Sequence, residues 1–178
     1  MPTPYIAIIS LHFTTERNLM SQRLNYPELS ADLYSKYMNF NLFLKKNKTA
    51  KEFNDIVTIR ASQLNGCAFC LDMHIKQAKI TGERELRLHH IAIWHESPLF
   101  SEREKAALLW TETLTHLAAK GVSDQIYQQV QEVLPDKEIS DLSFLIILIN
   151  GWNRLGVAFQ VEPGSADVIY GLNKAGLN

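Results

Sequence analysis

The amino-acid sequence predicts an all-α protein built as a single-domain helical bundle. Apolar residues recur at steps of three and four along most of the chain, capping patterns and glycine stops divide it into helical segments, and 178 residues suit one domain. We expect an N-terminal extension at residues 1–19, a helical domain at residues 20–160 and an irregular, glycine-containing C-terminal tail at residues 161–178.

Two helices are expected before the cysteines. The first runs from about Pro27 to Asn47. Its apolar stripe consists of Leu29, Leu33, Tyr37, Phe40 and Leu44. The second opens at Thr49 with a capping-box pattern and ends at Gly66, because glycine readily adopts the left-handed conformation that terminates helices.

The third helix carries the two cysteines of the chain. It begins near Cys67 and stops at Gly82, so that both cysteines lie in its first turn. A shorter helix follows it. The apolar side of this shorter helix is formed by Leu86, His90, Ile93 and Trp94.

Two further helices are marked by their capping residues. A capping box from Ser101 to Glu104 starts the first of them, which stops at Gly121. Ser123 caps the second, and that helix ends before Pro135.

The last helix is the most apolar of all. Its residues 144–149 are hydrophobic on every side, so they lie at the centre of the bundle or in an interface between subunits. At its end, we expect Trp152, Asn153 and Arg154 to pack and form hydrogen bonds rather than touch a substrate.

The composition excludes two classes of partner. With 18 basic and 19 acidic residues the net charge is −1, so no strong field would attract nucleic acid or an anionic membrane. No apolar stretch reaches the roughly twenty residues of a spanning helix. The apolar segment at residues 5–11 has neither the basic flank nor the cleavage site of a signal peptide. We therefore expect a cytoplasmic protein.

Redox chemistry is expected at the sequence Cys67-Ala68-Phe69-Cys70. Helical geometry places Cys67, Cys70 and His74 on one face. The unpaired N–H groups of a first turn favour the reactive thiolate, and His74 can reach Cys70 as a base, or as a cation once protonated. A hydroperoxide would oxidise one thiolate to a sulfenic acid, which the neighbouring thiol would convert to a disulfide.

A zinc site is an alternative that these residues leave open. A set of two cysteines and two histidines would consist of Cys67, Cys70 and His74 with one of His89, His90 or His95. Structural zinc sites usually take their two pairs of ligands from separate turns, which favours the redox interpretation.

Three segments of the chain carry a family resemblance. The most specific is residues 60–74, which read Arg-Ala-Ser-Gln-Leu-Asn-Gly-Cys-Ala-Phe-Cys-Leu-Asp-Met-His, and residues 99–108 and 150–155 support it. With these motifs the sequence resembles the alkylhydroperoxidase AhpD-like, or carboxymuconolactone decarboxylase, family. The resemblance extends over about residues 23–155 and makes the domain at residues 20–160 AhpD-like.

This resemblance implies a homo-oligomer, commonly a trimer or hexamer, with peroxidase or disulfide-reductase activity and no cofactor. It assigns to Cys70 the attack on an organic hydroperoxide and to Cys67 the resolution of the product. A dithiol electron donor, lipoyl-type or thioredoxin-like, would reduce the disulfide again. His74 and Asp55 match the proton relay of the family, although the family has a longer glutamate where this chain has Asp55.

Other interpretations remain at this point. Asp55 could be a solvated helix residue without a role in proton transfer. The decarboxylase branch of the family lacks the cysteine pair, so its chemistry is a minor alternative. A redox-sensing module that keeps the fold without useful turnover is another.

Overall fold

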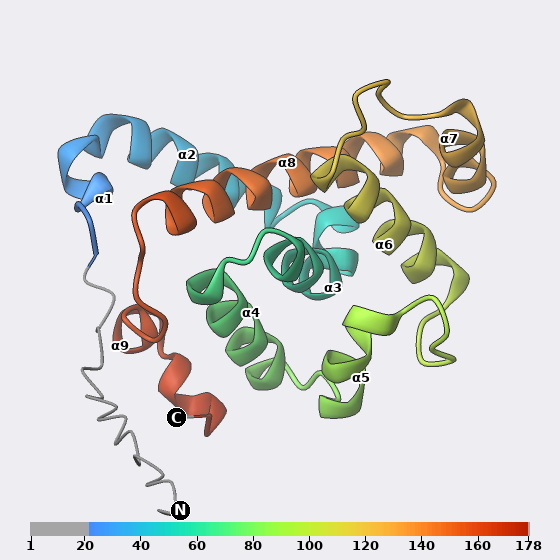
Figure 1. The fold of residues 1–178 in the computed structure, drawn as a ribbon. Helices are drawn as coiled ribbons and strands as arrows, with labels where there is room; N and C mark the ends of the chain where they lie inside the picture. Colours follow the sequence, from blue (N-terminus) through green and yellow to red (C-terminus); the bar gives the residue numbers. More distant parts are fainter. Residues whose placement is uncertain (1–21, 178) are drawn as a thin grey trace, which may run out of the picture.

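The computed structural model describes residues 22–177, so the expected extension at residues 1–19 lies outside the described part. Those residues form helices and no strand, which confirms the all-α prediction (Figure 1). The longer helices are α2 (Ala31–Leu44), α3 (Lys48–Leu64), α4 (Ala68–Ile80), α6 (Glu102–Thr115), α7 (Asp124–Gln131) and α8 (Asp136–Ala158). The short ones are α1 (Tyr26–Leu29), α5 (Glu85–His90), η1 (Ile91–Ile93), α9 (Asp167–Tyr170) and η2 (Leu172–Ala175).

Helix α3 lies at the centre of the bundle. It packs against α4, α6 and α8, and Figure 1 shows these helices arranged around it. Phe53, Val57 and Ile59 on α3 are completely buried in the single apolar core of the described residues. Because α3 touches both α4 and α8, it fixes the distance between the two helices that form the site.

The first part of the chain departs from the predicted pattern. The expected helix over residues 27–47 is interrupted at Ser30, whose backbone is not helical, and so becomes α1 and α2. Leu29 and Leu33 of the expected apolar stripe are 72% and 68% exposed. The capping box at Thr49 is also wrong, because the side chain of Asn47 accepts the hydrogen bond from the Ala50 N–H and α3 begins earlier.

Three other helix-end signals were predicted correctly. Gly66 ends α3 at a φ of +65°, in the left-handed region that favours glycine. Ser101 and Glu104 form the reciprocal capping box of α6. Ser123 accepts the hydrogen bond from the Ile126 N–H at the start of α7.

Two further helix predictions need correction. The helix after Gly82 changes from α-helix to 3₁₀-helix at Ile91, and it buries Leu88, Ile91 and the expected Trp94, whereas the expected Leu86 and Ile93 are exposed. Helix α6 ends at Thr115 rather than near Gly121, because His116 leaves the helical conformation.

The C-terminal residues are not the irregular tail that the sequence suggested. They contain α9 and η2, and η2 packs against α4 (Figure 1). Ala166 and Leu172 are buried in this contact.

The apolar run of α8 has two different sides. Leu145, Ile146 and Ile149 lie in the core, whereas Phe144 and Ile147 are 51% and 57% exposed. Phe43 on α2 is also exposed, and Phe144 packs against Phe40 of that helix with ring centroids 6.2 Å apart. Exposed apolar residues on two packed helices are typical of a protein interface. None of the helices within residues 22–177 is long and apolar enough to cross a membrane.

We expect the chain to form a homo-oligomer through the exposed side of α8. Ile147→Glu should then dissociate it toward the 20.3 kDa monomer, because an unpaired carboxylate in an apolar interface is strongly unfavourable. Ile93→Glu is the matched control, since Ile93 has the same exposed fraction, 57%, on another element. Light scattering at micromolar concentration measures the molecular mass of the parent and of both variants. A parent protein that is already monomeric would contradict the expectation.

Candidate redox site

The site begins where α3 ends and α4 starts. After the turn at Gly66, the Cys67 N–H donates to the Ser62 carbonyl at 3.0 Å, and Cys67 becomes the N-cap of α4. The Cys70 N–H donates to the Cys67 sulfur at 3.3 Å. A first-turn N–H therefore faces the sulfur of Cys67, which favours the thiolate of this residue when the pair is reduced.

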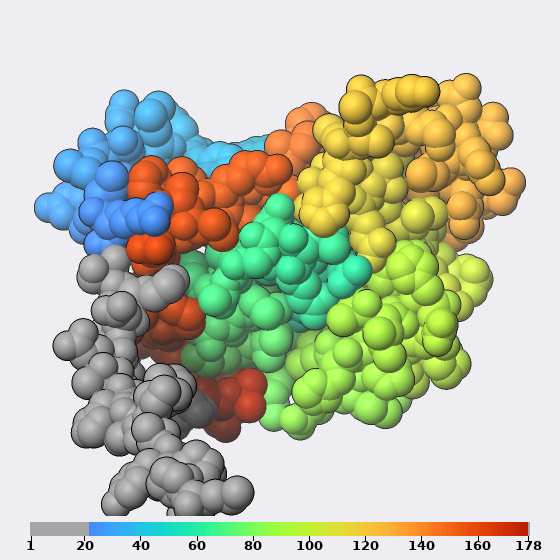
Figure 2. All heavy atoms as spheres, in the orientation of Figure 1, coloured from blue at the N-terminus to red at the C-terminus, as the bar shows by residue number. Residues whose placement is uncertain are grey.

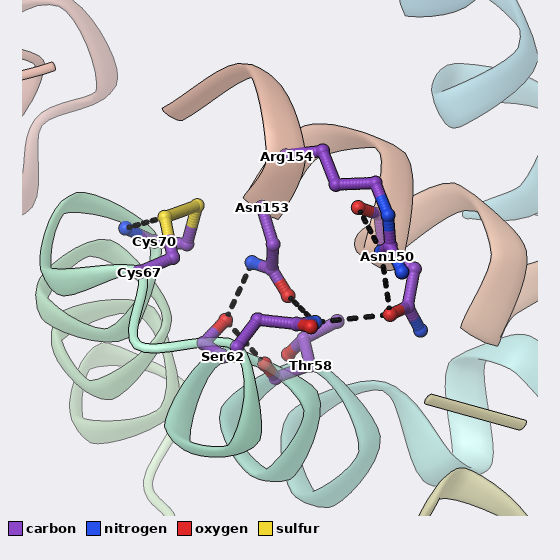
Figure 3. Close-up of a disulfide and its surroundings, with 8 residues drawn as sticks. Thr58, Ser62, Cys67, Cys70, Asn150, Asn153 and Arg154 are labelled. Atoms are coloured by element: carbon purple, nitrogen blue, oxygen red, sulfur yellow. Dashed lines mark hydrogen bonds between the residues drawn. A yellow bond between two sulfur atoms is a disulfide. The ribbon is translucent and has the colours of Figure 1, made fainter. Parts of the chain in front are cut away.

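Cys67 and Cys70 are joined by a disulfide, with their Cα atoms 5.3 Å apart. Figure 3 shows this disulfide at the start of α4. Both residues are only 2% exposed. On the facing helix α8, a Cβ atom at Gly156 would lie 2.8 Å from the Cys67 Sγ and 3.4 Å from the Cys70 Sγ. Only glycine allows α8 to approach the disulfide so closely.

A network of buried amides holds the turn before Cys67. The Asn65 side chain donates to the side-chain oxygens of Asn150 and Asn153, both at 2.9 Å, and the Asn153 amide donates to the Ser62 hydroxyl at 3.0 Å (Figure 3). Ser62 in turn donates to the Thr58 carbonyl at 2.7 Å. These bonds fix α8 to the end of α3, and thereby fix the start of α4.

The residues expected to pack at the end of α8 behave in two ways. Asn153 is completely buried in the amide network, and Arg154 donates to the Asn150 carbonyl at 2.9 Å, as the sequence predicted. Trp152 packs against Tyr37, with ring centroids 4.5 Å apart, but it also lines the cavity beside the disulfide. It is therefore in a position to touch a substrate, which the sequence analysis did not expect.

A cavity of about 640 Å³ lies beside the disulfide, between α2, α3, α4 and α8. It brings together Cys70, His74 and Asp55, whereas Cys67 does not line it. Most of the wall is apolar or aromatic. The apolar and aromatic lining residues include Met38, Leu42, Phe69, Met73, Leu148 and Trp152. Of the two cysteines, Cys70 is thus the one that a molecule in the cavity can reach.

His74 is one helical turn after Cys70 and is neutral at pH 7. Burial lowers its pKa to about 4; the hydrogen bond between its Nδ1 and the Gln77 side-chain oxygen, 3.1 Å long, opposes this shift, and the charge of Lys45 adds to it. A neutral imidazole can accept a proton but supplies no positive charge. The stabilisation of a thiolate therefore falls to the N-terminus of α4, rather than to a protonated His74.

Asp55 lies on α3 and faces the same cavity. It is half-buried, and its Oδ1 accepts a hydrogen bond from the Asn54 side chain at 2.8 Å. This position differs from that of a fully solvated helix residue. It places a carboxylate in the cavity that Cys70 and His74 line.

The histidines that the zinc alternative would add, His89, His90 and His95, do not join the site. His90 bonds to the Ser97 hydroxyl at 3.0 Å, and His95 stacks on Trp94 with ring centroids 3.6 Å apart. His89 is exposed. Within residues 22–177 no three His, Cys, Asp or Glu side chains are grouped so that they could hold a metal ion. The geometry of the described residues thus gives no support to the zinc alternative.

Gly156 is a site residue that the sequence analysis missed. A signal was present, because glycine inside a long helix costs roughly 1 kcal/mol relative to alanine and needs a reason to be there. The sequence does not show which helix approaches at that point.

The described residues form an all-helical bundle with a cysteine pair at a helix start beside an apolar cavity, and this fold is AhpD-like. The chain belongs to the carboxymuconolactone decarboxylase family, whose model matches residues 31–113. It is 37% identical over 146 residues to the uncharacterized protein YdfG of Bacillus subtilis, covering 82% of this chain and 99% of YdfG. It is 30% identical over 107 residues to the uncharacterized protein YnjA of Escherichia coli, covering 60% of this chain and 58% of YnjA.

Two solved structures share the fold. A protein of unknown function from Agrobacterium tumefaciens, described as a candidate antioxidant defence protein AhpD, has 32% identity and a TM-score of 0.76, over 80% of this chain and 97% of that one. An uncharacterized peroxidase-related protein from Silicibacter sp. TM1040 has 17% identity and a TM-score of 0.65, over 79% and 72% of the two chains. The second likeness concerns the fold alone.

The close approach of α8 to the disulfide can be tested with Gly156→Ala. The added methyl group overpacks against the sulfur atoms, which typically costs about 1–3 kcal/mol and exceeds the helix-propensity gain of roughly 1 kcal/mol when the contact cannot relax. We expect a lower free energy of unfolding for the oxidised protein in urea. Val157→Ala, at an exposed neighbouring position, should change stability by less than about 0.5 kcal/mol. A Gly156→Ala protein as stable as the parent would show that α8 can move away from the disulfide.

Proposed function

We propose that the protein is a thiol-dependent peroxidase that reduces organic hydroperoxides. Family membership and the likeness to a candidate antioxidant protein support a peroxidase-like role in general. The observation that carries the finer proposal is the cavity, which both Cys70 and the neutral His74 line. A volume of about 640 Å³ suits an organic molecule rather than hydrogen peroxide alone.

In the first step, the Cys70 thiolate attacks the terminal oxygen of the hydroperoxide. The O–O bond breaks, the alcohol leaves with a proton, and Cys70 becomes a sulfenic acid. His74 takes the thiol proton and returns it to the alcohol oxygen. Asp55, in the same cavity, is the second member of this relay and exchanges protons with His74 directly or through a water molecule.

In the second step, the Cys67 thiolate attacks the sulfur of Cys70. A disulfide forms, and the sulfenic hydroxyl leaves as water after it takes up a proton. The Cys70 N–H, which faces the Cys67 sulfur at 3.3 Å, favours the thiolate needed for this attack. A dithiol donor, lipoyl-type or thioredoxin-like, then reduces the disulfide and becomes a disulfide itself.

The first test is Cys70→Ser in the full-length protein. The variant should lose peroxide consumption, because no sulfur remains at the cavity wall. Cys67→Ser is the matched control. Its Cys70 should be oxidised once to the sulfenic acid, and turnover should then stop because no disulfide can form within the chain. In the parent, cumene hydroperoxide should consume two thiols per peroxide, and dihydrolipoamide should restore them.

Undiminished turnover in Cys70→Ser would sink the assignment of the attacking thiol. A parent protein that forms the disulfide once but does not turn over would instead be a redox-sensing module. Lactone decarboxylation without any peroxide consumption would favour the other branch of the family.

A second test concerns the carboxylate of Asp55. If it relays a proton, Asp55→Glu should keep or raise peroxidase turnover, and Asp55→Asn should lower it, since general acid–base steps contribute about 10²–10⁴-fold. The size of the loss is read from kcat, and thermal melting checks that all three proteins remain folded. Equal turnover in the three proteins would mean that Asp55 takes no part in proton transfer and that His74 alone carries it out.

A further inference from the structure

The C-terminal segment, residues 161–177, is part of the cavity wall. After α8 the chain turns at Gly164, forms α9 and η2, and buries Ala166 and Leu172. On the face drawn in Figure 2, this red segment lies directly against the green residues of α4. The family model stops at residue 113, so the matched region does not describe this contact.

A buried lysine holds the segment on α4. Lys76, two residues after His74, has a side chain that is only 8% exposed. Its Nζ donates to the Asp167 carboxylate at 2.6 Å and to the Asp72 carboxylate at 2.9 Å. The same oxygen of Asp72 accepts a hydrogen bond from the Gly164 N–H at 3.1 Å. The hydrogen bond to Asp167 raises the pKa of Lys76, so the ammonium stays charged at neutral pH.

Tyr170 is placed by this contact. It is the last residue of α9, one turn after Asp167, and it lines the cavity with Tyr26 and Tyr34. Burial, and to a smaller extent the neighbouring Tyr170, raises the pKa of Tyr34 to about 12. Tyr170 itself is 48% exposed, so its ring stands at the mouth of the cavity rather than in the core.

The cavity therefore depends on two parts of α4. Cys70 and His74 line it directly, and Lys76 holds the segment that brings Tyr170 to its mouth. An aromatic ring at the mouth can contact the apolar part of an organic hydroperoxide. Hydrogen peroxide has no such part, and so gains nothing from the ring.

We propose that Tyr170 is a specificity-determining residue, held in place by the Lys76–Asp167 ion pair, that favours bulky apolar hydroperoxides over hydrogen peroxide. This inference rests on the peroxidase function proposed above. It assigns to residues 161–177 a role in substrate selection.

The experiment compares kcat/KM for cumene hydroperoxide and for hydrogen peroxide with a dithiol donor. Tyr170→Ala should lower the value for cumene hydroperoxide roughly tenfold or more and change that for hydrogen peroxide by less than about twofold. Tyr170→Phe keeps the ring and should keep both values. Tyr127→Ala is the matched control, because Tyr127 is 39% exposed on α7 and does not line the cavity.

The ion pair is tested with Asp167→Asn, which keeps the shape of the side chain and removes its charge. Like Tyr170→Ala, this variant should lower the ratio of kcat/KM for cumene hydroperoxide to kcat/KM for hydrogen peroxide. An equal loss for both peroxides in Tyr170→Ala, or no loss for either, would overturn the proposal.

Failure of the peroxidase function can be told apart from failure of this inference. If the parent consumes neither peroxide, the binding of cumyl alcohol, the product of cumene hydroperoxide, is measured by calorimetry. Roughly tenfold weaker binding to Tyr170→Ala than to the parent would support a contact between the Tyr170 ring and the apolar part of the ligand. Equal binding, or no binding to the parent, would overturn it.

Discussion

The structure of the site depends on the close approach of α8 to the first turn of α4. At Gly156 there is room for a hydrogen atom but not for a carbon next to the Cys67 sulfur. The amides of Asn65 and Asn153 fix α8 to the end of α3, directly before the first turn of α4. Since buried amides lose much when a partner moves, the cysteine pair sits in a rigid frame while the cavity on its other side stays open.

The proposed roles of the two cysteines rest on access rather than on sequence order. Cys67 packs against Gly156 of α8 and accepts the N–H of Cys70, whereas Cys70 lines the cavity and Cys67 does not. Burial keeps His74 neutral, so this side chain brings no positive charge to the cavity, although Lys45 and Lys51 line it. The backbone at the start of α4 supplies positive potential next to the cysteines, and it acts without titrating.

Local signals predicted the fold well, because they depend on residues within one helical turn. The stop at Gly66, the capping box at Ser101 and the placement of the cysteines in one first turn are of this kind. Contacts between distant helices were not predictable. The sequence contains Gly156 and Lys76, but nothing in their neighbours shows that one faces a disulfide and the other a buried carboxylate.

Lys76 illustrates why a charged contact can position a segment better than an apolar one. Ala166 and Leu172 already bury the segment against the bundle, but apolar contacts tolerate sliding. An ammonium between two carboxylates has one favourable geometry, and it sets the register of α9 on α4. The second oxygen of Asp167 is buried without a hydrogen-bond partner among residues 22–177, an arrangement that greatest stability alone would not favour. The contact nevertheless places α9, and with it Tyr170, relative to α4, as the proposed role of this ring requires.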